Sequence, residues 1–426
     1  MQESCLMKRT VRRAPLIALA LATAVSVGVP SVAAAETAEP AYLAVIDSGS
    51  SGTRLTLYGD DATSLAPIVV TKVSNSSQGL STFASSPSQA GPSAVTPLLT
   101  QLDAYLAEEG IAKTDVPVAL LATAGLRDVR REDRGIAQAI LDSAGASINA
   151  SGYPIADNRI LPAVQEATLA WLDANVLGGT LNKKKDGFGI VEIGGASAQV
   201  AFRSPDVNGR AVQIIRVANQ AFPVVAVSYL GLGANDARSR MQAAHDAGSF
   251  CFPNNAPGQD PAVYVSTSAR PVAADTAMFQ WSRCATAFGG TITDVGSERT
   301  PAAKVSPSAL RHLAGFDSAQ FVGLGGIPYT FSDLGIDKAT NERTALRGAT
   351  EATCKGQNAW SKVLARFAGR SSAFADTLCS SGAYQYDFLF GSEGVGVKPD
   401  RFTVQAAALL REPAWTSGYA TTVFDP

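Results

Sequence analysis

The feature that most constrains the fold is a turn that occurs twice. An acidic residue followed two positions later by glycine ends a β-prone segment at Asp47-Ser48-Gly49 and again at Glu192-Ile193-Gly194. In each copy, alternating β-branched and aromatic residues resume after the turn, as they do in a strand–turn–strand unit. Two copies of one such unit predict two similar lobes that face each other across a cleft.

The remaining periodicity indicates an α/β fold. Apolar residues recur at helical spacing from Val95 to Leu106, and Gly110 then provides a stop signal. Strands that alternate with helices predict layers, with ligands bound at the carboxyl ends of the strands. The pattern is less regular beyond about residue 240. We expect strands at 42–46, 55–58, 116–122, 160–162, 188–193 and 199–202, helices at 95–106, 132–143 and 163–175, and a loop-like segment over 74–93.

Composition excludes several classes of protein. The chain has 426 residues, of which 46% are hydrophobic and 17% charged, so neither a wholly disordered chain nor a charged coiled coil fits. The length predicts two or three domains. Lys and Arg number 35 against 37 Asp and Glu, so no basic excess points to a nucleic-acid partner. His245 and His312 are the only histidines, which excludes a histidine-rich metal site.

The amino-terminal segment resembles an export signal. Basic residues at positions 8, 9, 12 and 13 precede an apolar run from Ala14 to Val29, and Ala33–Ala35 offers small residues for cleavage. The alternative is a membrane anchor, but the run is shorter than the ~20 residues that a span requires. We therefore expect residues 1–35 to be removed and the mature protein to be secreted or periplasmic, without a membrane segment.

Four cysteines follow that segment, at positions 251, 284, 354 and 379. An even number in an exported chain predicts two disulfides, for which three pairings exist. We favour Cys251–Cys284 with Cys354–Cys379, because sequence neighbours close the shortest loops. The alternative is four buried free thiols.

The first turn has the composition of an anion-binding loop. In Asp47–Arg54, glycines allow backbone N–H groups to converge on an anion, hydroxyl groups add donors and Arg54 adds charge. Asp47 is a candidate ligand for a divalent cation, directly or through water. The alternative is a solvated hairpin turn.

A second group of residues completes the candidate site. Gly194-Gly195-Ala196-Ser197 forms a second small-residue loop, and Glu192 becomes a second acid on the metal side. Thr123 offers a hydroxyl at the end of another expected strand. Glu166 lies in the first turns of a helix, where the helix dipole favours a carboxylate, and is a candidate base for water. The alternatives are ordinary turns and a glutamate placed only for the dipole.

Four segments resemble the apyrase-conserved regions of the nucleoside triphosphate diphosphohydrolases, or apyrases. They are AVIDSGSSGTRLTLY (Ala44–Tyr58), ATAGLR (Ala122–Arg127), QEATLAWLDANVLGG (Gln165–Gly179) and VEIGGASAQVAF (Val191–Phe202). The resemblance implies an actin-like (ribonuclease H-like) two-lobe fold, with lobe I over 40–162 and 400–426 and lobe II over 163–399. It also implies hydrolysis of nucleoside tri- and diphosphates with Mg²⁺ or Ca²⁺.

The same resemblance implies roles for individual residues. Glu166 matches the base for the attacking water, and Ser197 and Gln199 match residues that hold that water. Asp47 and Glu192 match the acids that bind the waters of the metal, with Trp415 of PAWTSG nearby. Tyr329 of GGIPYTF is the candidate that stacks on the nucleobase. The implied phosphate-binding residues are Ser48, Gly49, Ser50, Ser51, Gly52, Thr53, Arg54, Thr123, Ala124, Gly194, Gly195 and Ala196.

Three positions depart from the family pattern. Glu192 stands where the family usually has aspartate, Ala167 follows the candidate base where glycine is common, and Ser417 replaces a usual leucine. The extra methylene of Glu192 is expected to shift the water shell of the metal or the choice between Mg²⁺ and Ca²⁺.

Three other functions remain open at this point. An exopolyphosphatase shares the glycine-rich turns, and a small-molecule kinase of the same superfamily shares the fold. A non-catalytic nucleotide receptor would keep the phosphate clamp without turnover. We expect no covalent enzyme intermediate in the hydrolase.

Overall fold

The computed structural model describes residues 41–183, 187–254, 256, 278–295, 305–336, 341–369, 374–404, 409 and 411–426. Residues 39–426 form one unit, and the expected signal segment, 1–35, lies outside the described residues. No helix in the described ranges has the length and apolar character needed to cross a bilayer.

The first sheet begins with the hairpin that carries the first turn. Its strands follow the order β3-β2-β1-β4-β5, in which β1 pairs antiparallel with β2 and parallel with β4. β4 in turn pairs parallel with β5. Their bounds are β1 Tyr42–Ser48, β2 Thr53–Gly59, β3 Ile68–Ser77, β4 Val118–Ala122 and β5 Ile155–Ile160.

The second sheet repeats this arrangement. The hairpin of β6 with β7 contains the second turn, and β6 also pairs parallel with β10, as β1 does with β4. The sheet order is β11-β10-β6-β7-β9-β8. The duplication expected from the two acid-x-glycine turns is therefore confirmed at the level of topology. The bounds are β6 Phe188–Ile193, β7 Ser197–Arg203, β8 Val212–Val217, β9 Gln220–Leu230, β10 Gln320–Gly325 and β11 Phe402–Thr403.

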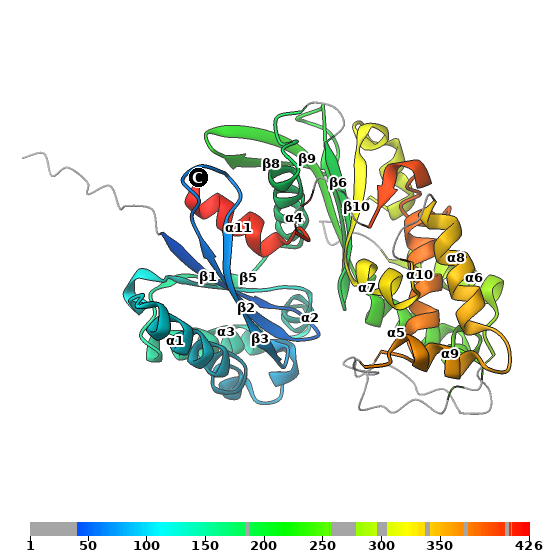
Figure 1. Cartoon of the computed structure of the whole chain (residues 1–426), viewed down its shortest axis with the longest axis horizontal. Coiled ribbons are helices and arrows are strands. Elements are labelled where there is room, and N and C mark those ends of the chain that lie inside the picture. The colour runs from blue at the N-terminus through cyan, green and yellow to red at the C-terminus, as the bar shows by residue number, and fades with distance from the viewer. Residues whose placement is uncertain are drawn as a thin grey trace, which may run out of the picture. The chain divides into compact units, whose positions relative to one another are not determined.

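Helices cover the outer faces of the two sheets (Figure 1). One apolar core joins the first sheet to α1 and α3, and another joins the second sheet to the helices from α5 to α10. Tight helical turns over 80–95 lead into α1. The helices are α1 Thr96–Glu109, α2 Ala124–Glu132, α3 Arg134–Ala150, α4 Ala163–Leu177, α5 Ala234–Ala244, α6 Trp281–Asp294, α7 Gly326–Asp333, α8 Glu342–Cys354, α9 Ala359–Arg366, α10 Leu378–Phe390 and α11 Trp415–Phe424.

A third core lies between the sheets. It contains apolar residues of both sheets together with Trp171 of α4 and Phe424 of α11. Ala167, which stands where the family usually has glycine, is fully buried in this core. Because α4 begins with the turn that holds Glu166, this packing fixes that carboxylate relative to both sheets.

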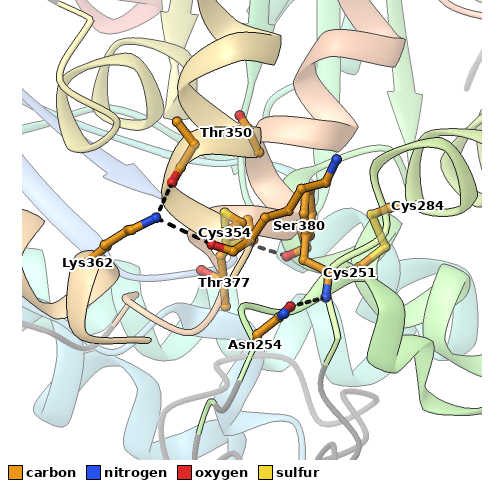
Figure 2. The surroundings of a disulfide bond; sticks show 12 residues. Cys251, Asn254, Cys284, Thr350, Cys354, Lys362, Thr377 and Ser380 are labelled. Atoms are coloured by element: carbon orange, nitrogen blue, oxygen red, sulfur yellow. Dashed lines mark hydrogen bonds between the residues drawn. A yellow bond between two sulfur atoms is a disulfide. The ribbon is translucent and has the colours of Figure 1, made fainter. Parts of the chain in front are cut away.

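Both favoured disulfides are present (Figure 2). Cys251–Cys284 joins the segment after α5 to α6, and Cys354–Cys379 joins the end of α8 to the first turn of α10. The second disulfide therefore fixes the start of a helix that lines the cleft described below.

Several local predictions were wrong. The segment over 74–93 is not a loop throughout, because β3 continues to residue 77 and helical turns occupy most of 80–95. The strand expected at 160–162 spans Ile155–Ile160 instead. After Thr123 the chain enters helix α2 directly, and the helix expected at 132–143 runs from Arg134 to Ala150. In each case pairing or packing with distant segments overrides weak local signals.

Candidate active site

The two turns open into one cleft. Its volume is about 680 Å³, and its walls include the ends of β1, β4, β6 and β10 together with the starts of α2, α4 and α10. The carboxyl ends of strands are the expected place for a ligand in a sheet of this kind.

The first loop keeps some of its hydroxyl groups for its own structure. The Gly49 N–H donates to the Gly52 carbonyl at 2.9 Å, which closes the turn. Ser48 Oγ lies 3.1 Å from Thr53 Oγ1, and both side chains are buried. Ser48, Gly52 and Thr53 are therefore absent from the described cleft wall, whereas Gly49, Ser50, Ser51 and Arg54 line it.

The second loop meets the first directly. Gly194 N–H donates to the Ser197 carbonyl at 2.9 Å, in the same geometry as the turn at Gly49. A Cβ atom added to Gly195 would lie 2.6 Å from Ser50 Oγ, so any side chain at this position would force the Ser50 hydroxyl to move. The two loops thus lie on opposite sides of one narrow space, which Thr123, Ala124, Gly194, Gly195 and Ala196 also line.

Arg127, whose role the sequence did not indicate, links the candidate base Glu166 to Ser197 of the second loop. Arg127 NH1 donates to Glu166 Oε2 at 2.8 Å, and NH2 donates to Ser197 Oγ at 3.1 Å. Gln199 Nε2 donates to the same Oγ at 2.6 Å and, with its side chain buried, supports Ser197 from behind the cleft wall. Because Ser197 Oγ accepts two hydrogen bonds, its O–H remains as a donor toward the cleft.

Asp47 and Glu192, the two candidate metal-binding acids, both line the cleft. Burial raises the pKa of Asp47 to about 7, with Arg54 opposing the shift and Glu166 adding to it. Burial, followed by Glu166 and Asp47, raises the pKa of Glu192 well above its usual value. The carboxylates therefore repel one another, which is the arrangement that a cation relieves.

The residues fit a hydrated divalent cation. Asp47 Oδ1 and Glu192 Oε2 are inaccessible to solvent and have no hydrogen-bond partner among the described residues. Within the same residues, no three acidic, histidine or cysteine side chains are close enough to bind one ion together. Carboxylate oxygens suit Mg²⁺ and Ca²⁺, and Mg²⁺ commonly keeps several of its waters. These two acids are thus suited to holding an ion through water.

A buried ion pair fixes the segment that carries Trp415. The Asp173 carboxylate of α4 is fully buried and accepts from Arg411 NH1 at 2.7 Å and NH2 at 2.9 Å. It also accepts from Ser417 Oγ at 2.7 Å. This contact gives a physical reason for serine at a position where the family usually has leucine. Trp415 and Glu412 line the cleft beside the acids.

The far half of the cleft carries aromatic side chains. Tyr329 of α7 is 67% exposed and Phe374 is 55% exposed, and both line the cleft. Large aromatic rings left exposed at a pocket are suited to stacking on a planar ligand. Phe374 lies in a part of the chain whose periodicity was too irregular to interpret from sequence.

Sequence reasoning missed further residues in and behind the wall, among them a glycine pair, Glu412 and Arg127. Gly325 ends β10 and Gly326 begins α7, and the glycine pair at the end of an apolar run was the available signal. Glu412 had no signal of its own. Arg127 lay inside a recognised motif, but only the folded chain shows that it reaches Glu166.

The duplicated strand–turn–strand units and the cleft between their turns define an α/β fold of two lobes, and comparison with known proteins identifies the family. The GDA1/CD39 (nucleoside phosphatase) family matches residues 33–424, so the chain belongs to that family. A solved structure of nucleoside triphosphate hydrolases from Neospora caninum has a TM-score of 0.53 at 15% identity, covering 90% of this chain and 92% of its own. That likeness confirms the fold.

Curated relatives are similar over about half of the chain. "Probable apyrase 5" of Arabidopsis thaliana is 31% identical over 209 residues, which is 47% of this chain and 42% of the relative. "Nucleoside-triphosphatase ntp-1" of Caenorhabditis elegans is 27% identical over 223 residues, covering 47% of this chain and 40% of the relative. The alignments thus span about two fifths of these relatives.

Proposed function

We propose that this protein hydrolyses the terminal phosphate of nucleoside tri- and diphosphates with a divalent cation. The observation that carries the proposal is the contact between the two loops, where Gly195 lies against Ser50. The Glu166 carboxylate lines the same cleft. Backbone N–H groups and hydroxyls on both sides suit a phosphate group, and phosphoryl transfer depends mainly on positioning and charge stabilisation.

We assign the role of general base to Glu166. Arg127 engages its Oε2, which leaves Oε1 to accept a proton from a water molecule. Ser197, held by Arg127 and Gln199, would donate its O–H to the same water or to the phosphate. Attack by this water on the terminal phosphorus, in line with the leaving oxygen, requires no covalent enzyme intermediate.

The cation would be held through water by Asp47 and Glu192, beside Thr123 and Trp415. When bound, Mg²⁺ or Ca²⁺ would neutralise the negative charges of the phosphate groups and of the nearby carboxylates. The orphaned oxygens of the two acids support this assignment. Tyr329 and Phe374 supply flat apolar surfaces for a base in the far half of the cleft.

We propose export as the cellular context. The two disulfides are typical of proteins that fold in an oxidising compartment. Within the folded unit, we propose residues 40–162 with 400–426 as one lobe and 163–399 as the other, with the exception of β11, which pairs with β10 in the second sheet.

Phosphate release from a substrate panel tests the activity. The panel contains ATP, ADP, AMP and inorganic polyphosphate, each with Mg²⁺, Ca²⁺ or EDTA. We expect release from ATP and ADP that depends on the cation and stops in EDTA. Release from polyphosphate alone would indicate an exopolyphosphatase, transfer to an added acceptor would indicate a kinase, and nucleotide binding without any release would indicate a receptor.

A further inference from the structure

Arg238 occupies a fixed place in the cleft wall, because the start of α5 is bonded to the second loop. Ala234 N–H donates to the Gly194 carbonyl at 2.8 Å, and Asn235 N–H donates to the Gly195 carbonyl at 2.9 Å. Arg238 comes one helical turn after Ala234, and residues spaced in this way share a helix face. The arginine is therefore held next to the loop that we assign to the terminal phosphate.

The guanidinium group is also fixed from the other side. Arg238 Nε donates to Ser380 Oγ at 3.0 Å, NH2 donates to Ser381 Oγ at 3.3 Å, and NH1 donates to Asn235 Oδ1 at 3.3 Å. The side chain is 3% exposed although it lines the cleft. Figure 2 shows Ser380 near the Cys354–Cys379 disulfide, which fixes the first turn of α10. A group ordered before binding loses little entropy when a ligand arrives.

The charges around the cleft favour an anionic partner for Arg238. Among the described lining residues, only Arg54 and Arg238 are cationic. Arg54 belongs to β2 in the first sheet, whereas Arg238 stands on the opposite wall. A polyphosphate in this cleft meets many carboxylates, so each fixed cation matters. Those carboxylates belong to Asp47, Glu166, Glu192, Asp333 and Glu412.

Arg238 lies between the two halves of the cleft. Through Asn235 it adjoins the phosphate loop, and through Ser380 and Ser381 it adjoins the start of α10. The segment that leads into α10 carries Phe374, one of the two exposed aromatic residues. A nucleotide that spans from the loop to the aromatic residues places its innermost phosphate between these halves.

We infer that Arg238 binds the phosphate group attached to the nucleoside and thereby favours nucleotides over inorganic phosphate chains. This inference rests on the proposed function. A guanidinium is planar, keeps its charge and directs its N–H groups within one plane, a geometry that suits phosphate oxygens and that lysine cannot reproduce. Removing charged hydrogen bonds of this kind is expected to weaken binding by about 10- to 100-fold.

Binding of ADP, AMP and adenosine tests the inference. Titration calorimetry with Mg²⁺ uses the full chain with Glu166→Gln, so that ADP is not consumed, and adds R238M, R238K or the control R240M. Arg240 lies on the same helix but is exposed and does not line the cleft. We expect R238M to weaken ADP and AMP by 10- to 100-fold, R238K by about 5-fold or more, and R240M by less than 2-fold, with adenosine unchanged throughout.

Several results would overturn the inference. An equal loss of adenosine affinity would place Arg238 against the nucleoside, and unchanged ADP affinity would remove it from binding altogether. If R238M does not fold, as judged by thermal melting, R238K still provides the comparison. If the parent protein binds ADP but the Arg238 variants give either of these two results, the inference fails and the proposed function stands. If the parent protein does not bind ADP, both fail.

Discussion

Replacing Arg127 with methionine should strongly destabilise the protein. The Arg127 and Glu166 side chains are only 2% and 8% exposed and lie 2.8 Å apart. Removal of one partner leaves the other charge buried without compensation, which typically costs about 3–5 kcal/mol. The Leu161 carbonyl and Ser197 Oγ lose a donor at the same time, which favours the upper part of that range.

The sharper form of this prediction is a double-mutant cycle of R127M with Glu166→Gln. The double variant has no buried charge at this pair, so it should be more stable than R127M alone. Glu166→Gln by itself should cost about 3 kcal/mol, the lower end of that range, because Arg127 loses its carboxylate partner but keeps neutral acceptors at the Leu161 carbonyl and Ser197 Oγ. Urea unfolding followed by tryptophan fluorescence measures the free energy of unfolding, provided that the m-value does not change.

A matched control uses the half-buried ion pair between Arg159 and Asp157, whose side chains are 37% and 22% exposed and lie 2.7 Å apart. Its removal by R159M should cost less than about 1 kcal/mol. If R127M costs no more than R159M, or if the second substitution lowers stability further, the buried pair does not hold Glu166 as argued here.

Three further predictions concern the loop, the pH response and the disulfides. Gly195→Ala should raise KM for ADP by about 10-fold or more, because the added Cβ displaces the Ser50 hydroxyl in the phosphate clamp. The loss of stability should be small, since that serine side chain is flexible. The control G348A, on an open helix face, should leave KM unchanged. Burial, together with Asp128, raises the pKa of Asp236 to about 7, so the folded state holds this proton more tightly and stability should fall as pH rises from about 4 to 7. Asp236→Asn should flatten that fall in urea unfolding between pH 5 and 8, and an unaltered slope would refute the assignment. The C251S/C284S variant should lose about 3.7 kcal/mol, as the 33-residue separation implies, and unchanged urea stability would contradict this.

The sequence predicted the parts of the site that local chemistry encodes. Asp47, Glu192 and the glycines of both loops lie in short segments with unusual composition, and the structure brings these segments together at one cleft. The duplication of the strand–turn–strand unit was visible for the same reason. These features depend on backbone freedom and strand alternation, which are properties of a few adjacent residues.

Parts that depend on distant contacts were not predictable. Arg127 meets Glu166 across 39 positions, and Asp173 meets Arg411 across 238. The strand at Ile155–Ile160 is largely polar and is defined by pairing with β4, so its own sequence gave little signal. Arg238 and Phe374 reach the cleft only after α5 and α10 pack together, and neither helix has a sequence pattern that indicates a ligand.

The most direct test of the central claim is the turnover of Glu166→Gln at saturating ATP with Mg²⁺, measured together with nucleotide affinity. The account predicts that kcat falls by 10²-fold or more while the Kd for nucleotide changes by less than about 3-fold, because the variant keeps both phosphate loops but cannot accept the proton. Turnover close to that of the unmodified protein would show that another group activates the water.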